Sequence, residues 1–86
     1  MKTFDDLVFK PHRIRNGVQA TLDLGNDIEV SVVGGDGLYG NGVTSFEVAA
    51  FYITLGKFVP MPDGEDVSGH NSKKEVTKLI NYLENL

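Results

Sequence analysis

The sequence predicts a small α+β domain, a twisted antiparallel β-meander of three to five strands with one C-terminal α-helix packed on one face. Two neighbouring segments alternate apolar and polar side chains, as half-buried strands do. The C-terminal segment instead repeats apolar side chains every three or four positions, which is the spacing of one helical face. At 86 residues the chain has the length of one small domain, which we expect to span residues 1–86.

The central hairpin is the most clearly patterned part of the predicted sheet. Its strands, residues 17–24 and 28–33, alternate apolar and polar side chains as far as Val32, and Val33 adds an apolar side chain to the outer face. Gly25 and Asn26 between them tolerate the positive φ angles of tight turns. Because the alternation has a period of two, we expect one face of the hairpin to be buried and the other to be exposed.

Three more strands complete the expected meander. A short strand at residues 4–9 stops before Pro11, since proline has no backbone N–H to donate to a sheet. A long strand at residues 44–54 places a row of aromatic and aliphatic side chains on one face. A turn then leads into a last strand at residues 57–60, which prolines end, and residues 60–71 are predicted to form a loop.

The C-terminal segment, residues 72–85, is the predicted helix. Ser72 and Glu75 have the spacing of a capping box, in which each side chain accepts a hydrogen bond from a backbone N–H at the helix start. One apolar stripe follows, formed by Val76, Leu79, Ile80 and Leu83. Because a helix of this length is marginally stable alone in water, we expect the stripe to pack on the sheet.

Charge is distributed unevenly along the chain. Twelve acidic and eight basic residues give a net charge of −4, and between residues 17 and 70 Lys57 is the one basic residue against eight acidic ones. A binder of DNA or RNA needs a positive surface, so this acidic centre disfavours nucleic acid as a partner. Because the sequence has neither an apolar run that spans a bilayer nor a signal-peptide pattern, we expect a cytoplasmic protein without membrane contact.

The sequence lacks the patterns of an enzyme, a metal site or a cofactor site. Cysteine is absent, and the two histidines belong to no Ser-His-Asp pattern. Residues 35–40 match G-x-G-x-x-G, but a predicted strand follows them where a dinucleotide site needs a helix N-terminus. The acidic segment at 61–66 lacks the ligand spacing of a calcium loop. We therefore expect no catalytic residue, no metal and no cofactor.

The glycine-rich segment, residues 34–42, is the candidate binding site. It holds five of the ten glycines together with a leucine and a tyrosine, more than a strand-to-strand turn requires. In one interpretation these two side chains fold back over the sheet; in the other they anchor a partner protein, as interface hot-spot residues do. The second interpretation names as partner-binding residues Asp36, Leu38, Tyr39 and Asn41, with Phe51 on the helix-free face of the sheet.

Arg13 and Arg15 lie in the one basic segment of the N-terminal region. Such side chains either contact an anion, such as a nucleotide phosphate, or pair with the protein's own carboxylates. Both interpretations remain open on the sequence alone.

The first half of the chain resembles a family of small bacteriophage proteins. The similarity lies in MKTFDDLVFKPH at residues 1–12, in GVQA at 17–20, and in VSVVGG and GLYG between residues 30 and 40. The family consists of accessory proteins encoded by tailed phages, and no known activity comes with it. The resemblance implies expression in the cytoplasm of an infected bacterium and a role in altering host metabolism or blocking host defence.

Three functional hypotheses follow. The first is a non-enzymatic phage-type accessory protein that binds a host bacterial protein, such as a defence or metabolic factor, through residues 34–42. The second is a self-associating domain that forms a homodimer through strand edges or through the face bearing Val33 and Phe51. The third is a binder of a small molecule or a nucleotide signal, using the glycine-rich segment with Arg13 or Arg15 as the anion contact.

Overall fold

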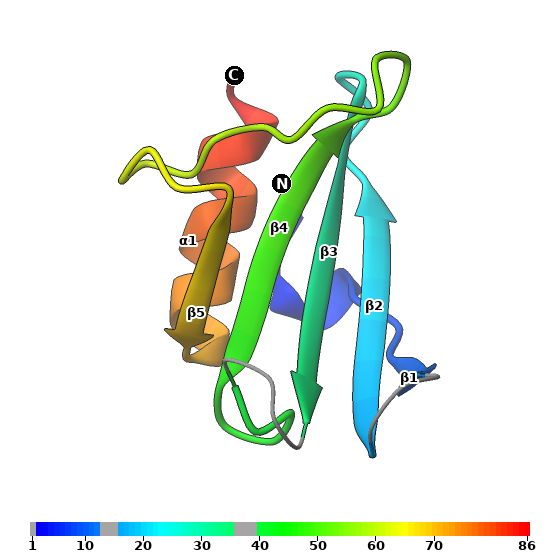
Figure 1. Cartoon of the computed structure of the whole chain (residues 1–86), viewed down its shortest axis with the longest axis vertical. Helices are drawn as coiled ribbons and strands as arrows, with labels where there is room; N and C mark the ends of the chain where they lie inside the picture. The colour runs from blue at the N-terminus through cyan, green and yellow to red at the C-terminus, as the bar shows by residue number, and fades with distance from the viewer. Residues whose placement is uncertain (1, 13–15, 36–39) are drawn as a thin grey trace.

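The computed structural model describes residues 2–12, 16–35 and 40–86 and shows a five-stranded antiparallel sheet in which the strands neighbour each other in chain order (Figure 1). One 3-10 helix precedes the sheet and one α-helix follows it. The elements in chain order are η1 (Phe4–Asp6), β1 (Lys10–His12), β2 (Gly17–Asp23), β3 (Ile28–Gly35), β4 (Phe46–Tyr52), β5 (Val67–Asn71) and α1 (Lys73–Glu84). The predicted α+β meander with a C-terminal helix is confirmed.

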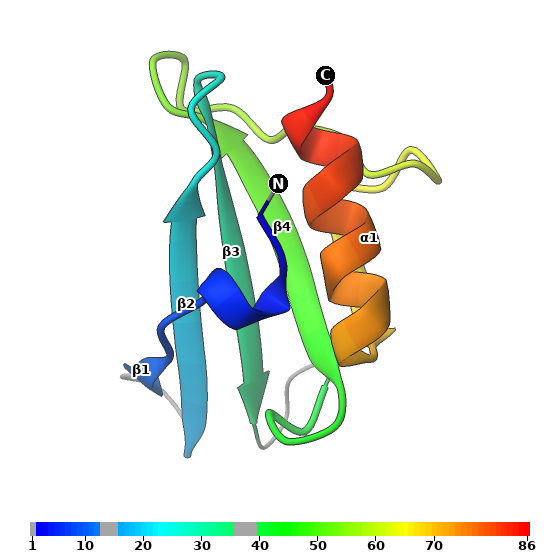
Figure 2. The same ribbon diagram turned by 180° about the vertical axis from the view of Figure 1, so that it is seen from behind.

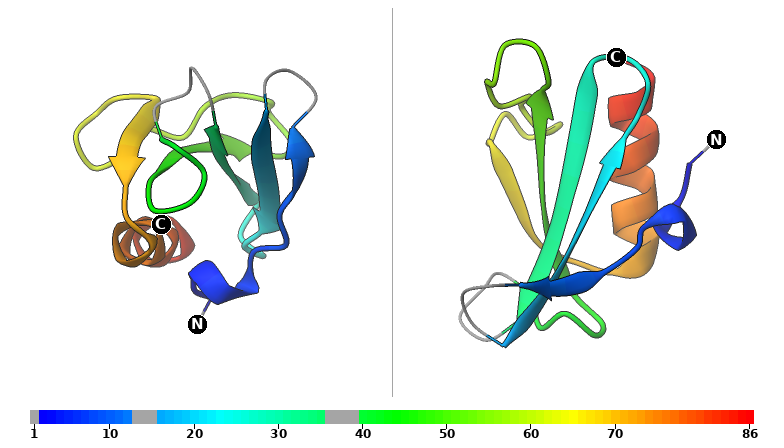
Figure 3. Two further views of the ribbon diagram at one scale, coloured as in Figure 1. Left: turned by 90° about the horizontal axis from the view of Figure 1, so that it is seen from below. Right: turned by 90° about the vertical axis from the view of Figure 1, so that its right-hand side faces the viewer.

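The molecule has two layers. Both η1 and α1 lie on the same face of the sheet, and no helix among the described residues lies over the opposite face (Figures 2 and 3). The alternation of side chains along the strands explains this arrangement. In β4, Val48 and Ala50 are fully buried under the helical layer, whereas Glu47, Ala49 and Phe51 between and beyond them are only partly buried.

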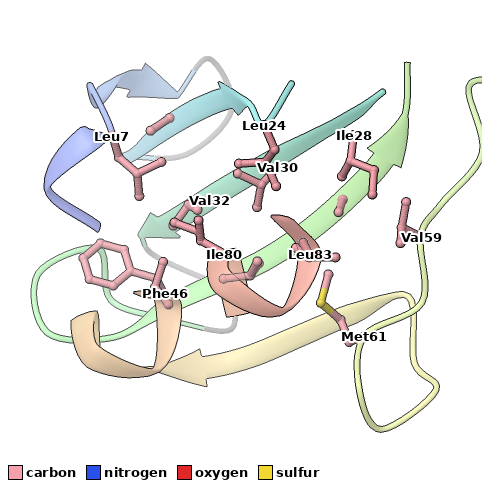
Figure 4. Packing of buried hydrophobic residues seen from close by; sticks show 14 residues of the cluster. Leu7, Leu24, Ile28, Val30, Val32, Phe46, Val59, Met61, Ile80 and Leu83 are labelled. Carbon is pink, nitrogen blue, oxygen red and sulfur yellow. The ribbon is translucent and has the colours of Figure 1, made fainter. Parts of the chain in front are cut away.

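One hydrophobic cluster fills the space between sheet and helices (Figure 4). The sheet contributes the inward-facing residues of β2, β3 and β4, which the period-two pattern predicts. The helix contributes Val76, Ile80 and Leu83, all fully buried, with Leu79 packed against the cluster from its edge. The predicted apolar stripe of the helix is therefore confirmed, and so is the capping box of Ser72 and Glu75.

The strand predicted at residues 4–9 is wrong. Residues 4–6 form η1, because Thr3 accepts a hydrogen bond from the N–H of Asp5 and its own N–H donates to the carboxylate of Asp6 at 2.7 Å. The chain then crosses the helix-side face of the sheet, and β1 begins only at Lys10. Pro11 lies inside β1, which is possible because β1 is an edge strand.

The prediction for the other edge of the sheet is wrong in part. The strand expected at residues 57–60 is reduced to one antiparallel bridge, between Phe51 and Phe58. The fifth strand, β5, lies instead within the region predicted as loop and pairs with the first half of β4. Residues 57–59 and then β5 therefore pair with the same edge of β4. Residues 60–66, which connect these two segments, turn away from that edge.

The remaining predicted elements agree with the structure to within two residues at each end. The β2–β3 turn differs in one detail. Gly25 and Asp27 have positive φ angles of 83° and 67°, whereas Asn26 does not. The Asn26 side chain instead donates hydrogen bonds from Nδ2 to the carbonyls of Leu83, at 3.0 Å, and Glu84, so the turn is attached to the end of α1.

A phenylalanine-lined pocket as the candidate functional site

A pocket of about 340 Å³ opens at the end of the sheet where β3 finishes and β4 starts. Three phenylalanines from separate segments line it. Phe4 comes from η1, Phe9 from the crossing before β1, and Phe46 from the first position of β4. Their ring centroids lie 5.1 to 5.5 Å apart, a separation at which tilted aromatic rings attract each other. Phe46 is buried and forms the floor, whereas Phe4 and Phe9 are half-buried walls.

The rim of the pocket combines an exposed apolar side chain with a cation. Val43 is 69% exposed although it belongs to an ordered turn. Lys73, the first residue of α1, places its Nζ 5.6 Å from the centroid of the Phe4 ring, which is the geometry of a cation–π contact. No carboxylate of the described residues forms an ion pair with Lys73. The rim therefore offers one apolar contact and one positive charge.

Tight backbone packing of the glycine-rich segment forms the wall beside Val43. A Cβ atom on Gly40 would lie 2.6 Å from the Cα of Phe46, so only glycine allows the chain to run this close to β4. The N–H of Gly35 donates to the carbonyl of Gly40 at 2.9 Å, and the N–H of Gly42 donates to that of Ser45 at 2.9 Å. These contacts bring the segment back onto the end of β3 and leave Gly42 lining the pocket.

Asn41 holds the turn from residue 41 to 45 in shape. Its Oδ1 accepts hydrogen bonds from the N–H groups of Val43 at 2.8 Å, Thr44 at 2.8 Å and Ser45 at 3.1 Å. Its Nδ2 donates to the hydroxyl of Thr44. The side chain named from the sequence as a polar partner contact thus fixes the position of Val43 on the rim.

The start of α1 has a defined electrostatic environment. Glu75 accepts a hydrogen bond from the backbone N–H of Ser72 at 2.9 Å and donates its own N–H to the Ser72 hydroxyl. Hydrogen bonds that the Glu75 carboxylate accepts from Ser72, chiefly from its backbone N–H and next from its side chain, hold the pKa of that carboxyl below its usual value, and the charge of Lys78 acts in the same direction. The negative charge therefore remains in the first turn of the helix, two residues after Lys73, and stabilises the helix start.

The structure does not bring all the sequence-predicted site residues together. Asp36, Leu38 and Tyr39, and likewise Arg13 and Arg15, lie outside the described residues. Phe51 lies on the helix-free face, as expected. It is near the C-terminal end of β4, whereas the glycine-rich segment adjoins the N-terminal end. Phe51 lies five positions along the strand from Phe46, about 17 Å, so Phe51 and the pocket belong to different surfaces.

Sequence reasoning missed most of the pocket. The sequence pattern places Phe4 and Phe9 on one strand and Val18 and Phe46 on the buried faces of others, and it does not indicate that these side chains meet. Two of the missed residues, Val43 and Lys73, stand out in the sequence. Val43 is a large apolar residue inside a turn, and Lys73 stands at the first position of a predicted helix.

No group of three or more potential metal-ligating side chains occurs in residues 2–12, 16–35 and 40–86. Neither of the described helices has the length and apolar character needed to cross a membrane. Comparison of the chain with protein-family models, curated proteins and solved structures gave no match.

Proposed function

We propose that this protein is a non-enzymatic binding module that captures a host protein in the cytoplasm of a phage-infected bacterium. The observation that supports this proposal is the pocket itself, an apolar hollow that opens beside the glycine-rich segment. The phage context and the bacterial partner, such as a defence or metabolic factor, rest on the resemblance of the N-terminal half to small phage accessory proteins.

The size and lining of the pocket suit one large side chain of a partner protein. A volume of about 340 Å³ is at the small end of ligand sites, which usually enclose most of their ligand. Three aromatic rings and the exposed Val43 offer the contacts that anchor residues of protein interfaces use. Lys73 on the rim favours an acidic group next to that anchor. We therefore expect an aromatic or large aliphatic anchor with an acidic neighbour.

The chemistry of the lining supports binding rather than catalysis. Apart from Lys73, the residues that line the pocket are phenylalanine, valine and glycine, which supply no nucleophile, acid or base. Lys73 is exposed to solvent, whereas lysines that act as nucleophiles are usually desolvated. The described part of the pocket thus has no pair of groups that could share a proton transfer.

Capture from bacterial lysate with matched variants tests the proposal. Val43→Asp puts a charge on the rim, and Leu55→Asp makes the same change at a side chain 66% exposed at the opposite end of the sheet. A partner held by wild type and by Leu55→Asp, but lost with Val43→Asp, is the expected result. Lys73→Glu should weaken capture, and Lys74→Glu, which changes a residue outside the pocket lining, should not. If the two variants of each pair retain the partner equally, or lose it equally, the pocket is rejected as the binding site.

A further inference from the structure

The face of the sheet opposite α1 is a second surface, separate from the pocket. Both helices lie on the other side, so no helix of the part of the chain that the structure describes covers this face at β2, β3 and β4 (Figure 1). We propose that it docks a basic amphipathic helix of a partner protein. The strand register determines which side chains lie together on this face.

The antiparallel register aligns the outward side chains in rows that cross the strands. Partners in adjacent antiparallel strands point to the same face, so each row can be followed from the pairing. The row nearest the β2–β3 turn contains Asp23, Glu29, Phe51 and Phe58; the middle row contains Thr21, Ser31, Ala49 and Val67; the third contains Lys10, Gln19, Val33 and Glu47.

The apolar side chains of this face gather over β4 and the segments paired with its edge. The rings of Phe51 and Phe58 lie 4.7 Å apart, and Phe58 remains 44% exposed in spite of that contact. Ala49 and Val67, in the next row, extend the same patch with small side chains and are only partly buried. An apolar patch on an otherwise helix-free sheet face is the kind of surface that a helix covers in layered folds.

Carboxylates flank this patch on two sides. Asp23 and Glu29 face each other across β2 and β3, and Glu29 is in turn the cross-strand neighbour of Phe51. Glu47 lies at the other end of β4, four residues or about 13 Å from Phe51. None of these three carboxylates forms an ion pair with a described residue. The one lysine in these rows, Lys10, lies on edge strand β1, three strands away from Glu47.

This distribution of charge decides between the classes of occupant. A second copy of the chain on this face would bring two sets of carboxylates together, and like charges across an interface cost free energy. A nucleic acid or an anionic lipid surface would meet the same repulsion. A helix with an apolar stripe flanked by lysine and arginine matches both the patch and its acidic borders. We therefore assign the face to a basic amphipathic helix rather than to self-association.

The test uses the whole chain and a fluorescent helical peptide of leucine and lysine as the probe. A peptide of the same pattern with glutamate in place of lysine is the negative probe. We expect the basic peptide to bind and to shift the backbone amide signals of Thr21, Ser31 and Ala49 in NMR spectra. The double variant Glu29→Lys, Glu47→Lys should bind it about tenfold more weakly, as expected for removing close charge pairs.

The matched control reverses two charges elsewhere. Glu65→Lys with Asp66→Lys makes the same change of net charge in the loop before β5, where both residues are exposed, and should leave the affinity within about a factor of two. Phe58→Ser should weaken binding without changing the charge. Val43→Asp should leave the affinity for the basic peptide unchanged. A failure of the helix-docking proposal can therefore be distinguished from a failure of the pocket proposal.

Several results would overturn the assignment. Absence of binding, equal losses in the two double variants, or amide shifts confined to the pocket would each do so. A wild-type dimer in sedimentation analysis that Phe58→Ser dissociates would assign the face to a second copy of the chain instead.

Discussion

A Cβ atom on Gly34 would lie 2.4 Å from the Cα of Gly42. The two residues belong to opposite ends of the glycine-rich segment, and their backbones touch where the chain returns toward β4. This contact leaves no space for a side chain at Gly34, and at Gly42 the positive φ of 77° favours glycine as well. It also determines where Gly42 lines the pocket. The composition of this segment therefore has a structural cause, and the binding site lies beside it.

Gly34→Ala should lower the free energy of unfolding by about 1–3 kcal/mol, because the added methyl group would overlap with backbone that cannot move independently. Gly56→Ala is the control. Gly56 has a positive φ of 66° but open space around it, so alanine there should cost only about 1 kcal/mol of backbone strain. Urea unfolding of both variants measures the difference. A loss for Gly34→Ala no larger than that for Gly56→Ala would contradict the close contact.

Asn26→Ala should destabilise the end of α1. The Asn26 Nδ2 donates to the carbonyl of Leu83 at 3.0 Å and so satisfies a backbone group that the helix leaves unpaired. Losing this bond should cost about 1 kcal/mol. Amide hydrogen exchange should accelerate in the residues that follow Leu79 more than in β3 and β4. Unchanged exchange at the helix end would show that the turn does not stabilise it.

Glu75→Gln should have an effect that depends on pH. Folding lowers the pKa of the Glu75 carboxyl through the Ser72 hydrogen bonds. The resulting stability is fully present above the ordinary glutamate pKa and is lost as pH falls through the lowered pKa of the folded protein. The difference in free energy of unfolding between wild type and Glu75→Gln should therefore be largest near neutral pH and shrink in acid. A difference that grows in acid would contradict the capping interaction.

Met61→Ala should destabilise the protein strongly, although residue 61 belongs to the loop of residues 60–66 between the two segments that pair with β4. Met61 is 2% exposed and lies in the core cluster with Val59. Truncating a buried methionine costs about 2–5 kcal/mol. Leu55→Ala, at an exposed position of the neighbouring turn, should change the stability little. If the two variants unfold at comparable urea concentrations, Met61 does not anchor the loop of residues 60–66.

The parts of the fold that follow a regular pattern could be predicted from the sequence. The β2–β3 hairpin and β4 alternate apolar and polar side chains, and α1 has both a capping box and an apolar stripe. In each of these elements local pattern and burial agree, so the pattern identifies the buried face. The packing of α1 on that face follows, because both apolar surfaces need covering.

Elements without such a pattern could not be predicted. Four of the five residues of β5 are serine, glycine, histidine and asparagine, which favour turns, and β5 is a strand because its backbone completes the edge of β4. The pairing of β4 with β5 shifts its register between Phe46 and Val48. In the same part of β5, His70 has a positive φ of 57°. The N-terminal segment is similar: its phenylalanines pack on the core, but through a 3-10 turn and a crossing rather than a strand.

The candidate site was only partly predictable for a related reason. The glycine-rich segment is visible in the composition, and the structure places the pocket beside it. The pocket itself joins residues from η1, β2, β4 and α1, and such a meeting depends on how the layers stack. A pattern read along the chain reports which face a side chain occupies, but not which distant side chain lies next to it.

Photo-crosslinking inside bacterial cells tests directly whether the pocket end of the molecule captures a host protein. A benzophenone amino acid replaces Val43 on the pocket rim in one variant and Leu55 at the opposite end of the sheet in the other, both at exposed positions. If the pocket end captures a host protein, irradiation should give one discrete adduct from position 43 and none from position 55. The same adducts from both positions, or an adduct from position 55 alone, would contradict the proposed function.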